Sequence, residues 1–253
     1  MKFKTALTAF LGAVIALVAV EAYHRFAPSA ANSSRTELQS VIREYIISHP
    51  EVLQEAMAEL ERRQTASETE KARGAIKEHA QTLFNSPRQV TIGNRDGDVT
   101  LVEFFDYNCG YCKQALPDMN ALMSGDGKLR IVLKEFPVLG PGSIEAAQVA
   151  VAVRMQDPTG EKYLAFHQKL LGSRGQADKA RALAAARDAD VDIARLEADL
   201  NSDEVKASIE ENFKLAESLG INGTPSYVIG NELVAGAVGL NALKDKIKSA
   251  RGS

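Results

Sequence analysis

Cys109 and Cys112 are the only two cysteines among the 253 residues, and they are the side chains of this sequence with the most distinctive chemistry. Gly110 and Tyr111 separate them. Two cysteines at this spacing could form a structural disulfide, contribute half of a metal site, or cycle between a dithiol and a disulfide.

A metal site and a purely structural disulfide are both disfavoured. Structural zinc needs about four ligands, and beyond the two thiols the chain offers His24, His49, His79 and His167, none of them in a second ligand pair. A disulfide that closes so small a loop removes little entropy from the unfolded chain. The sequence therefore favours a redox pair, and we expect no metal.

The position of the cysteines along the chain supports this interpretation. They follow an apolar run at 99–105 and precede a segment with apolar residues at helical spacing, 115–123. The N-terminus of a helix stabilises an anion, which favours a reactive thiolate at Cys109. Cys112, one helical turn later, would face inward and could attack a mixed disulfide formed at Cys109.

Two further features could belong to the same site. Glu103 lies within the apolar run, where a buried carboxylate is costly; it is either a proton acceptor for Cys112 or a structural acid paired with a group such as Lys134. Pro225, preceded by Thr224, begins a later apolar run. At the first residue of a strand a proline can lack a ladder hydrogen bond without destabilising the sheet. Such an X-Pro bond in a tight turn is a candidate cis peptide.

The elements that must position these residues follow the order strand, strand, helix, strand, helical block, strand, strand, helix. This order predicts an α/β layer structure with a helical insertion. We expect strands at 90–92, 99–105, 129–136, 226–229 and 232–235, a helical block at about 143–219, and a last helix at 240–250.

Residues 36–64 form a separate helical segment. Apolar residues recur at helical spacing from Leu38 to Ile46 and again from Val52 to Leu60, with a break around Pro50; a mostly polar segment, 61–78, follows. The apolar stripe needs a partner. The partner is either the rest of the same chain or the same stripe of another copy, as in an oligomerisation stalk.

Residues 1–31 are typical of an export signal or a retained N-terminal anchor, because Lys2 and Lys4 precede an uncharged apolar run at 5–20. A buried helix of the folded domain is the other interpretation. Both export interpretations place the protein where thiols can be oxidised. The charge of -3 is well mixed along a chain of ordinary globular composition, so nucleic acid is not an expected partner.

The stretch 103–112, with Pro117 and the later Gly223-Thr224-Pro225, resembles the thioredoxin superfamily. The helical block makes the chain similar to the DsbA-type periplasmic thiol–disulfide oxidoreductases. The resemblance implies a thioredoxin fold with an inserted helical domain at about 140–219, within a DsbA-like domain at 88–253. A helical oligomerisation stalk and linker at 36–85 would precede it.

This resemblance also implies a role for the cysteines and the acid. Cys109 would be the exposed nucleophile and Cys112 the resolving thiol, and the Cys109–Cys112 disulfide would be the redox group, with no added cofactor. Glu103 would manage the proton of Cys112.

Other residues would contact the substrate. Gly110 and Tyr111 would tune the thiolate, and Thr224 and Pro225 would form a cis-proline loop that pairs its backbone with an extended client chain. Gly-Tyr stands where the best-known DsbA pattern has Pro-His, and threonine before the proline is usual in periplasmic isomerases and reductases. Both departures favour an isomerase or reductase over a primary oxidase.

Residues 37–64 resemble the N-terminal segment of ScsC-type proteins, which trimerise and can shuffle disulfides. The implied function is a periplasmic disulfide isomerase or reductase, soluble or tethered to the inner membrane; the alternatives are a DsbA-type oxidase, a copper-binding protein or a non-catalytic chaperone. The implied partners are unfolded or wrongly disulfide-bonded exported proteins, a membrane redox protein (a DsbD/ScsB-like reductase or a DsbB-like oxidase), and further copies of the chain, as in a trimer.

Overall fold

The computed structural model describes residues 17–22 and 30–252. Most of the expected signal or anchor at 1–31 lies outside these residues, so it stays a prediction. Within the described ranges no helix is both long enough and apolar enough to cross a membrane. The chain divides within a helix into two compact units, 1–64 and 65–253, which we take in turn.

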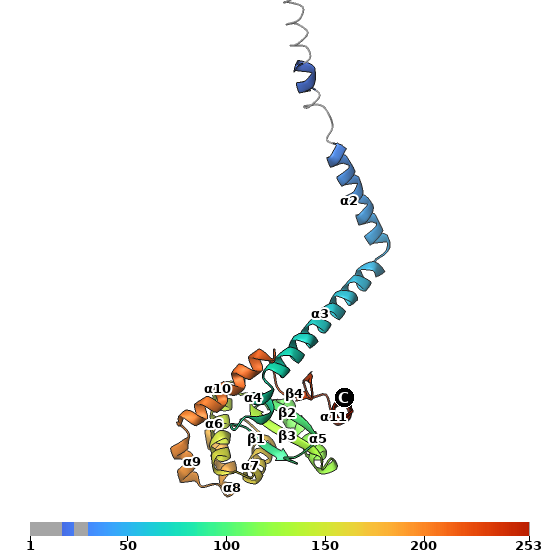
Figure 1. The fold of residues 1–253 in the computed structure, drawn as a ribbon. Helices are drawn as coiled ribbons and strands as arrows, with labels where there is room; N and C mark the ends of the chain where they lie inside the picture. Colours follow the sequence, from blue (N-terminus) through green and yellow to red (C-terminus); the bar gives the residue numbers. More distant parts are fainter. Residues whose placement is uncertain (1–16, 23–29, 253) are drawn as a thin grey trace, which may run out of the picture. The chain divides into compact units, whose positions relative to one another are not determined.

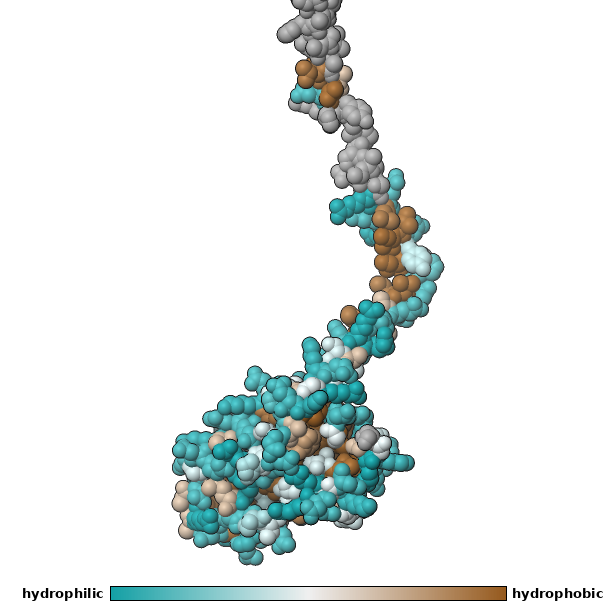
Figure 2. All heavy atoms as spheres, in the orientation of Figure 1, coloured by the Kyte–Doolittle hydropathy of each residue, from teal (hydrophilic) through white to brown (hydrophobic). Residues whose placement is uncertain are grey.

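The first unit contains helix α2 (Ala30–Ser48) and the start of α3 (Glu51–Glu78) (Figure 1). The predicted break near Pro50 is confirmed, and the His49 ring stacks on Tyr45 at 4.5 Å between centroids. Apolar atoms gather along α2 (Figure 2). The large apolar side chains exposed on this unit between residues 38 and 60 are Leu38, Val41, Ile42, Tyr45, Ile47, Leu53, Met57 and Leu60.

Helix α3 continues to Glu78, although the apolar pattern in the sequence ends near Leu60. The extension is rich in Glu, Lys, Arg and Ala, which favour helix without an apolar face. Ion pairs one turn apart support it, such as Arg73 to Glu70 at 2.8 Å. Ile76, near the end of α3, is buried in the second unit.

The second unit is built on a five-stranded sheet in the order β1-β3-β2-β4-β5. Strands β2 and β3 are parallel, and the other neighbouring pairs are antiparallel. The strands are β1 (Val90–Gly93), β2 (Val99–Phe105), β3 (Leu129–Glu135), β4 (Ser226–Ile229) and β5 (Glu232–Ala235). The predicted strands are therefore confirmed, with β1 ending one residue later and β3 ending one residue earlier.

Helices cover both faces of this sheet. On one face α5 (Gly110–Gly125) and α11 (Leu240–Arg251) pack with Leu101 and Phe105 of β2. On the other face the end of α3, α4 (Ala80–Asn85) and α10 (Asp203–Ser218) pack with Val102 and Phe104. Strand β2 is thus buried on both faces, which explains its nearly continuous apolar sequence.

Five helices lie between β3 and β4 and form the helical insertion: α6 (Pro141–Gln156), α7 (Glu161–Leu171), α8 (Lys179–Asp188), α9 (Ile193–Asp199) and α10. Helix α6 contacts each of the other four. Its segment from Ala146 to Val153 is almost wholly buried, because helices surround it. The predicted α/β fold with a helical insertion is confirmed.

Candidate active site

The two cysteines lie where β2 gives way to α5. Cys109 is the N-cap residue of α5, and its Sγ accepts a hydrogen bond from the backbone N–H of Cys112 at 3.3 Å. The same thiol donates to the backbone carbonyl of Thr224 at 3.1 Å. Both cysteines are free thiols. The structure therefore brings together the cysteine pair and the Thr224–Pro225 loop, which are more than a hundred residues apart in sequence.

The expected exposure of Cys109 is wrong for this reduced form. Cys109 is 5% exposed and Cys112 is fully buried. The Thr224 carbonyl against Sγ accounts for part of this cover. Cys109 is still the more accessible thiol of the two.

The Thr224–Pro225 peptide bond is cis, as the resemblance implies. Backbone hydrogen bonds fix the loop at the start of β4: Gly236 N–H donates to the Pro225 carbonyl at 2.8 Å. The Ser226 hydroxyl donates to the Gly223 carbonyl, also at 2.8 Å. The loop is held in place by the sheet to which it belongs.

Glu103 lies in the middle of β2 and is 3% exposed. Its neighbour across the sheet on β4 is Tyr227, and its neighbour on β3 is Leu133. Burial raises the pKa of Glu103 to about 8. The carboxyl group is close enough to Cys112 for its charge to raise the pKa of that thiol, although burial is the larger cause.

A structural pair between Glu103 and Lys134 is excluded. Lys134 is the neighbour of Phe104, one residue further along β2, so its side chain lies on the opposite face of the sheet. There its Nζ donates to the Thr82 carbonyl of α4 at 3.1 Å. Burial lowers the pKa of Lys134 to about 8.

Gly110 and Tyr111 lie at the surface beside the cysteines, and Tyr111 is 65% exposed. The loop after β3 adds two exposed apolar side chains, Val138 and Leu139. This loop is fastened to the cysteine segment, since Val138 N–H donates to the Asp106 carboxylate at 2.9 Å.

Sequence reasoning assigned no role to Asp106, Asn108 or Tyr227. Asp106 and Asn108 are polar residues directly after a buried strand, and that placement was the available signal. Tyr227 carried no signal, because its approach to Glu103 depends on the register between β2 and β4.

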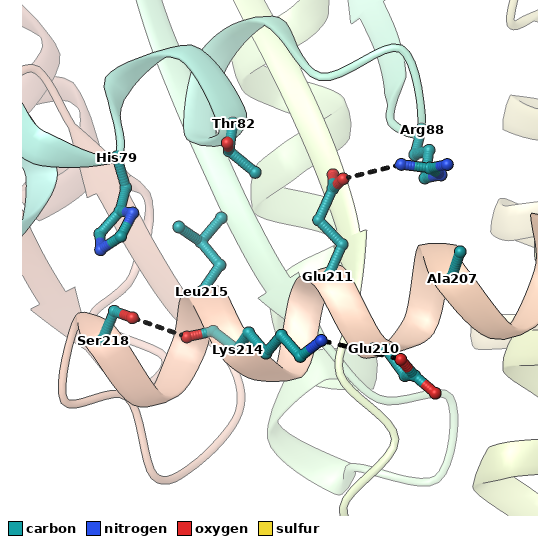
Figure 3. A pocket seen from close by; sticks show the side chains of 9 residues that line it. All are labelled: His79, Thr82, Arg88, Ala207, Glu210, Glu211, Lys214, Leu215 and Ser218. Atoms are coloured by element: carbon teal, nitrogen blue, oxygen red, sulfur yellow. Dashed lines mark hydrogen bonds and ion pairs between the residues drawn. The ribbon is translucent and has the colours of Figure 1, made fainter.

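A cavity of about 390 Å³ lies elsewhere in the second unit, between the α4 segment and α10 (Figure 3). Its charged groups pair with one another, as Arg88 does with Glu211 at 3.5 Å and Lys214 with Glu210 at 3.8 Å. No residue of the cysteine site lines it. In the described part of the chain there is no cluster of three or more His, Cys, Asp or Glu side chains suited to a metal ion.

Comparison with known proteins gives the family. The DSBA-like thioredoxin domain matches residues 100–248, and the N-terminal domain of the copper resistance protein ScsC matches residues 35–66. A crystal structure of a thioredoxin-like oxidoreductase from Silicibacter pomeroyi is 43% identical, with a TM-score of 0.65 over 68% of this chain and 98% of that one.

A crystal structure of Proteus mirabilis ScsC in a transitional conformation is 27% identical, with a TM-score of 0.65 over 87% of this chain and 98% of that one. A Na(+)/H(+) antiporter, NhaA 1 of Salinispora arenicola, is 29% identical over 160 residues. The match covers 62% of this chain but only 24% of the antiporter, so the chain spans about a quarter of that relative. From the domain match and the geometry around Cys109, the chain belongs to the DSBA-like thioredoxin domain family of thiol–disulfide oxidoreductases.

Proposed function

We propose that this protein is an exported disulfide isomerase or reductase that acts on the cysteines of extracytoplasmic proteins. The observation that carries the proposal is the position of the Cys109 sulfur, between the Cys112 backbone N–H and the Thr224 carbonyl. This position puts the sulfur of the more accessible cysteine at the start of α5 and against the cis-proline loop, where a client disulfide can reach it.

Each step of the reaction follows from this arrangement. The Cys109 thiolate attacks one sulfur of a client disulfide, a mixed disulfide forms, and the other client sulfur leaves as a thiolate. In isomerisation a different thiolate of the same client attacks the client sulfur of the mixed disulfide, so a new client disulfide forms and Cys109 leaves as a thiolate. In reduction Cys112 attacks instead, so the client leaves with two thiols and the Cys109–Cys112 disulfide forms.

Glu103 is the group we assign to the proton of Cys112. Cys112 must lose a proton to attack, and burial raises its pKa. A carboxyl group whose pKa is about 8 can both accept and return a proton near neutral pH.

Client chains would bind beside the cysteines. The backbone at Thr224 and Pro225 can pair with an extended peptide by strand addition. The exposed Tyr111 ring offers apolar area next to the nucleophile. The client class is therefore an unfolded or wrongly disulfide-bonded chain with extended segments.

A stalk that joins several copies of the chain would favour an isomerase over an oxidase. The exposed apolar side chains that recur at helical spacing on α2 and the start of α3 form a stripe within the segment that matches the ScsC N-terminal domain: Leu38, Val41, Ile42, Tyr45, Leu53, Met57 and Leu60. Packing this stripe against other copies would join several cysteine sites on one stalk, which increases avidity for a misfolded client. An isomerase must also be kept reduced, so we propose a membrane reductase of the DsbD or ScsB kind as its electron donor.

The deciding experiment is the rescue of scrambled ribonuclease by the full chain after any signal is removed. We expect ribonuclease activity to return in the presence of a small amount of reducing thiol, and a Cys109→Ser variant to give none. Fast oxidation of reduced ribonuclease without rescue of the scrambled form would contradict the proposal. That outcome would favour the DsbA-type oxidase, which the DSBA-like domain match also accommodates.

A further inference from the structure

Asp106 is a buried acidic residue directly before the cysteine segment. It is 2% exposed, and its carboxylate accepts four hydrogen bonds. Oδ1 accepts from Asn108 N–H and from the Ser143 hydroxyl, both at 2.7 Å. Oδ2 accepts from Val138 N–H at 2.9 Å and Leu139 N–H at 3.0 Å.

The backbone of the same residue contacts both cysteines. Its carbonyl accepts the Cys109 N–H at 3.0 Å. Burial raises the pKa of the Cys112 thiol, and a hydrogen bond from the Asp106 backbone opposes that rise. Asp106 is therefore anchored through its side chain, while its main chain reaches the nucleophile and the resolving thiol.

Asn108 extends these contacts into the helical insertion. Its Nδ2 donates to the Ser143 hydroxyl at 3.0 Å and to the Ala177 carbonyl at 2.8 Å. Its Oδ1 accepts from Ala177 N–H at 2.6 Å. The cysteine segment, the loop after β3 and the insertion thus meet at the Asp106 carboxylate.

We propose that Asp106 is a positioning residue for thiol–disulfide exchange, whose carboxylate fixes the main chain that carries both cysteines against the loop at 138–139. The inference rests on the proposed function. Charge-assisted hydrogen bonds are stronger than neutral ones, and a buried N–H group that loses its acceptor is costly. Without the carboxylate the cysteine segment shifts, and a shift of about 1 Å can slow a reaction about a hundredfold.

Asp157 provides a matched control. It is 8% exposed, and its carboxylate also accepts four hydrogen bonds, in a loop of the helical insertion. The donors are Thr159 N–H at 3.1 Å, the Thr159 hydroxyl at 2.7 Å, Gly160 N–H at 3.0 Å and Tyr163 N–H at 2.8 Å. If Asp106 only stabilised its loop, the same substitution at either position would lower stability and leave the rate of thiol–disulfide exchange unchanged.

The experiment compares Asp106→Asn and Asp157→Asn in the full chain. Thermal unfolding measures stability, and stopped-flow reaction of the reduced protein with glutathione disulfide measures exchange between about pH 5 and about pH 9. We expect both variants to lose stability. Only Asp106→Asn should slow exchange, by about tenfold or more, and change the shape of the pH profile.

Equal exchange rates for Asp106→Asn and the wild type, or equal slowing by both variants, would overturn the inference. If the wild type itself does not react with glutathione disulfide, the proposed function is wrong and the inference falls with it. Ser143→Ala is a milder second variant, because it removes one donor and leaves the carboxylate in place. It should slow exchange about threefold, and a folded Ser143→Ala protein with the wild-type rate would count against the inference.

Discussion

Glu103 of β2 lies directly opposite Tyr227 of β4, on the face of the sheet that carries the cysteines. Both side chains are buried. Burial raises the pKa of Tyr227, and the charge of Glu103 raises it further. The phenol is therefore neutral, and the carboxyl group beside Cys112 is the group here that can change its charge near neutral pH.

The first prediction concerns stability and pH. An unfolded glutamate ionises above its ordinary pKa of 4.5, whereas folded Glu103 ionises near 8. The stabilisation from the neutral carboxyl group is thus fully present below pH 4.5 and is lost as the pH rises to about 8. A Glu103→Gln variant lacks this loss, so its free energy of unfolding should exceed that of the wild type by a few kcal/mol at pH 8, at roughly 1.4 kcal/mol per pKa unit.

Urea unfolding followed by circular dichroism at several pH values measures this difference. Glu217→Gln, at an exposed position of α10, is the control and should leave the wild-type pH dependence unchanged. If wild type and Glu103→Gln have parallel pH profiles, the pKa of Glu103 is not raised, and the assignment of the Cys112 proton to this carboxyl group loses its basis.

The second prediction concerns Lys134, which should make stability increase with pH rather than decrease, at a higher pH than Glu103. Burial lowers its pKa from 10.5 to about 8, so between these values the unfolded lysine binds a proton that the folded one does not. Stability due to this residue is full above pH 10.5 and is lost as the pH falls to about 8. Lys134→Met should remove that dependence, whereas Lys244→Met, at an exposed position of α11, should retain it.

Unfolding measurements across this alkaline range test the prediction. A Lys134→Met protein whose stability rises with pH as steeply as that of the wild type would show that another group is responsible.

The third prediction separates the two thiols. A Cys112→Ser variant keeps Cys109 at the helix N-terminus but has no second thiol to resolve a mixed disulfide. Incubation with glutathione disulfide should therefore give a stable adduct of one glutathione per chain by intact mass, while the wild type releases it. Cys109→Ser should form little adduct, because Cys112 is fully buried. An adduct of equal yield on Cys112 would reverse the assigned roles.

The parts of this molecule that local pattern determines were predictable. The strands, the helical block and the cysteine pair at a helix start follow from apolar periodicity and from residue types. The far end of α3 was not predictable in this way, because charged residues that favour helix leave no apolar stripe to count. The absence of a Glu103–Lys134 pair required the register of β2 against β3.

The role of Asp106 was hidden for a related reason. Three of the four donors to its carboxylate come from residues 138, 139 and 143, and no local pattern joins them to position 106. A polar residue after a buried strand indicates a site of interest, but its partners are known only once the chain is folded.

The last prediction tests self-association through the stripe on α2. Ile42 belongs to this stripe, one position after Val41 and four after Leu38, and it is 48% exposed in the single chain. Ile42→Glu would bury a charge in the stalk of an oligomer, which is costly. It should give a monomer by light scattering and lower the rescue of scrambled ribonuclease, whereas the exchange rate with glutathione disulfide should not change.

Ile47 supplies the control for this variant. It is on the same helix and is 67% exposed, but five residues from Ile42 it points to the other side. Ile47→Glu should therefore keep the wild-type mass and rescue. A wild-type protein that is already monomeric at micromolar concentration would contradict the stalk, and rescue that survives in an Ile42→Glu monomer would separate isomerase activity from self-association.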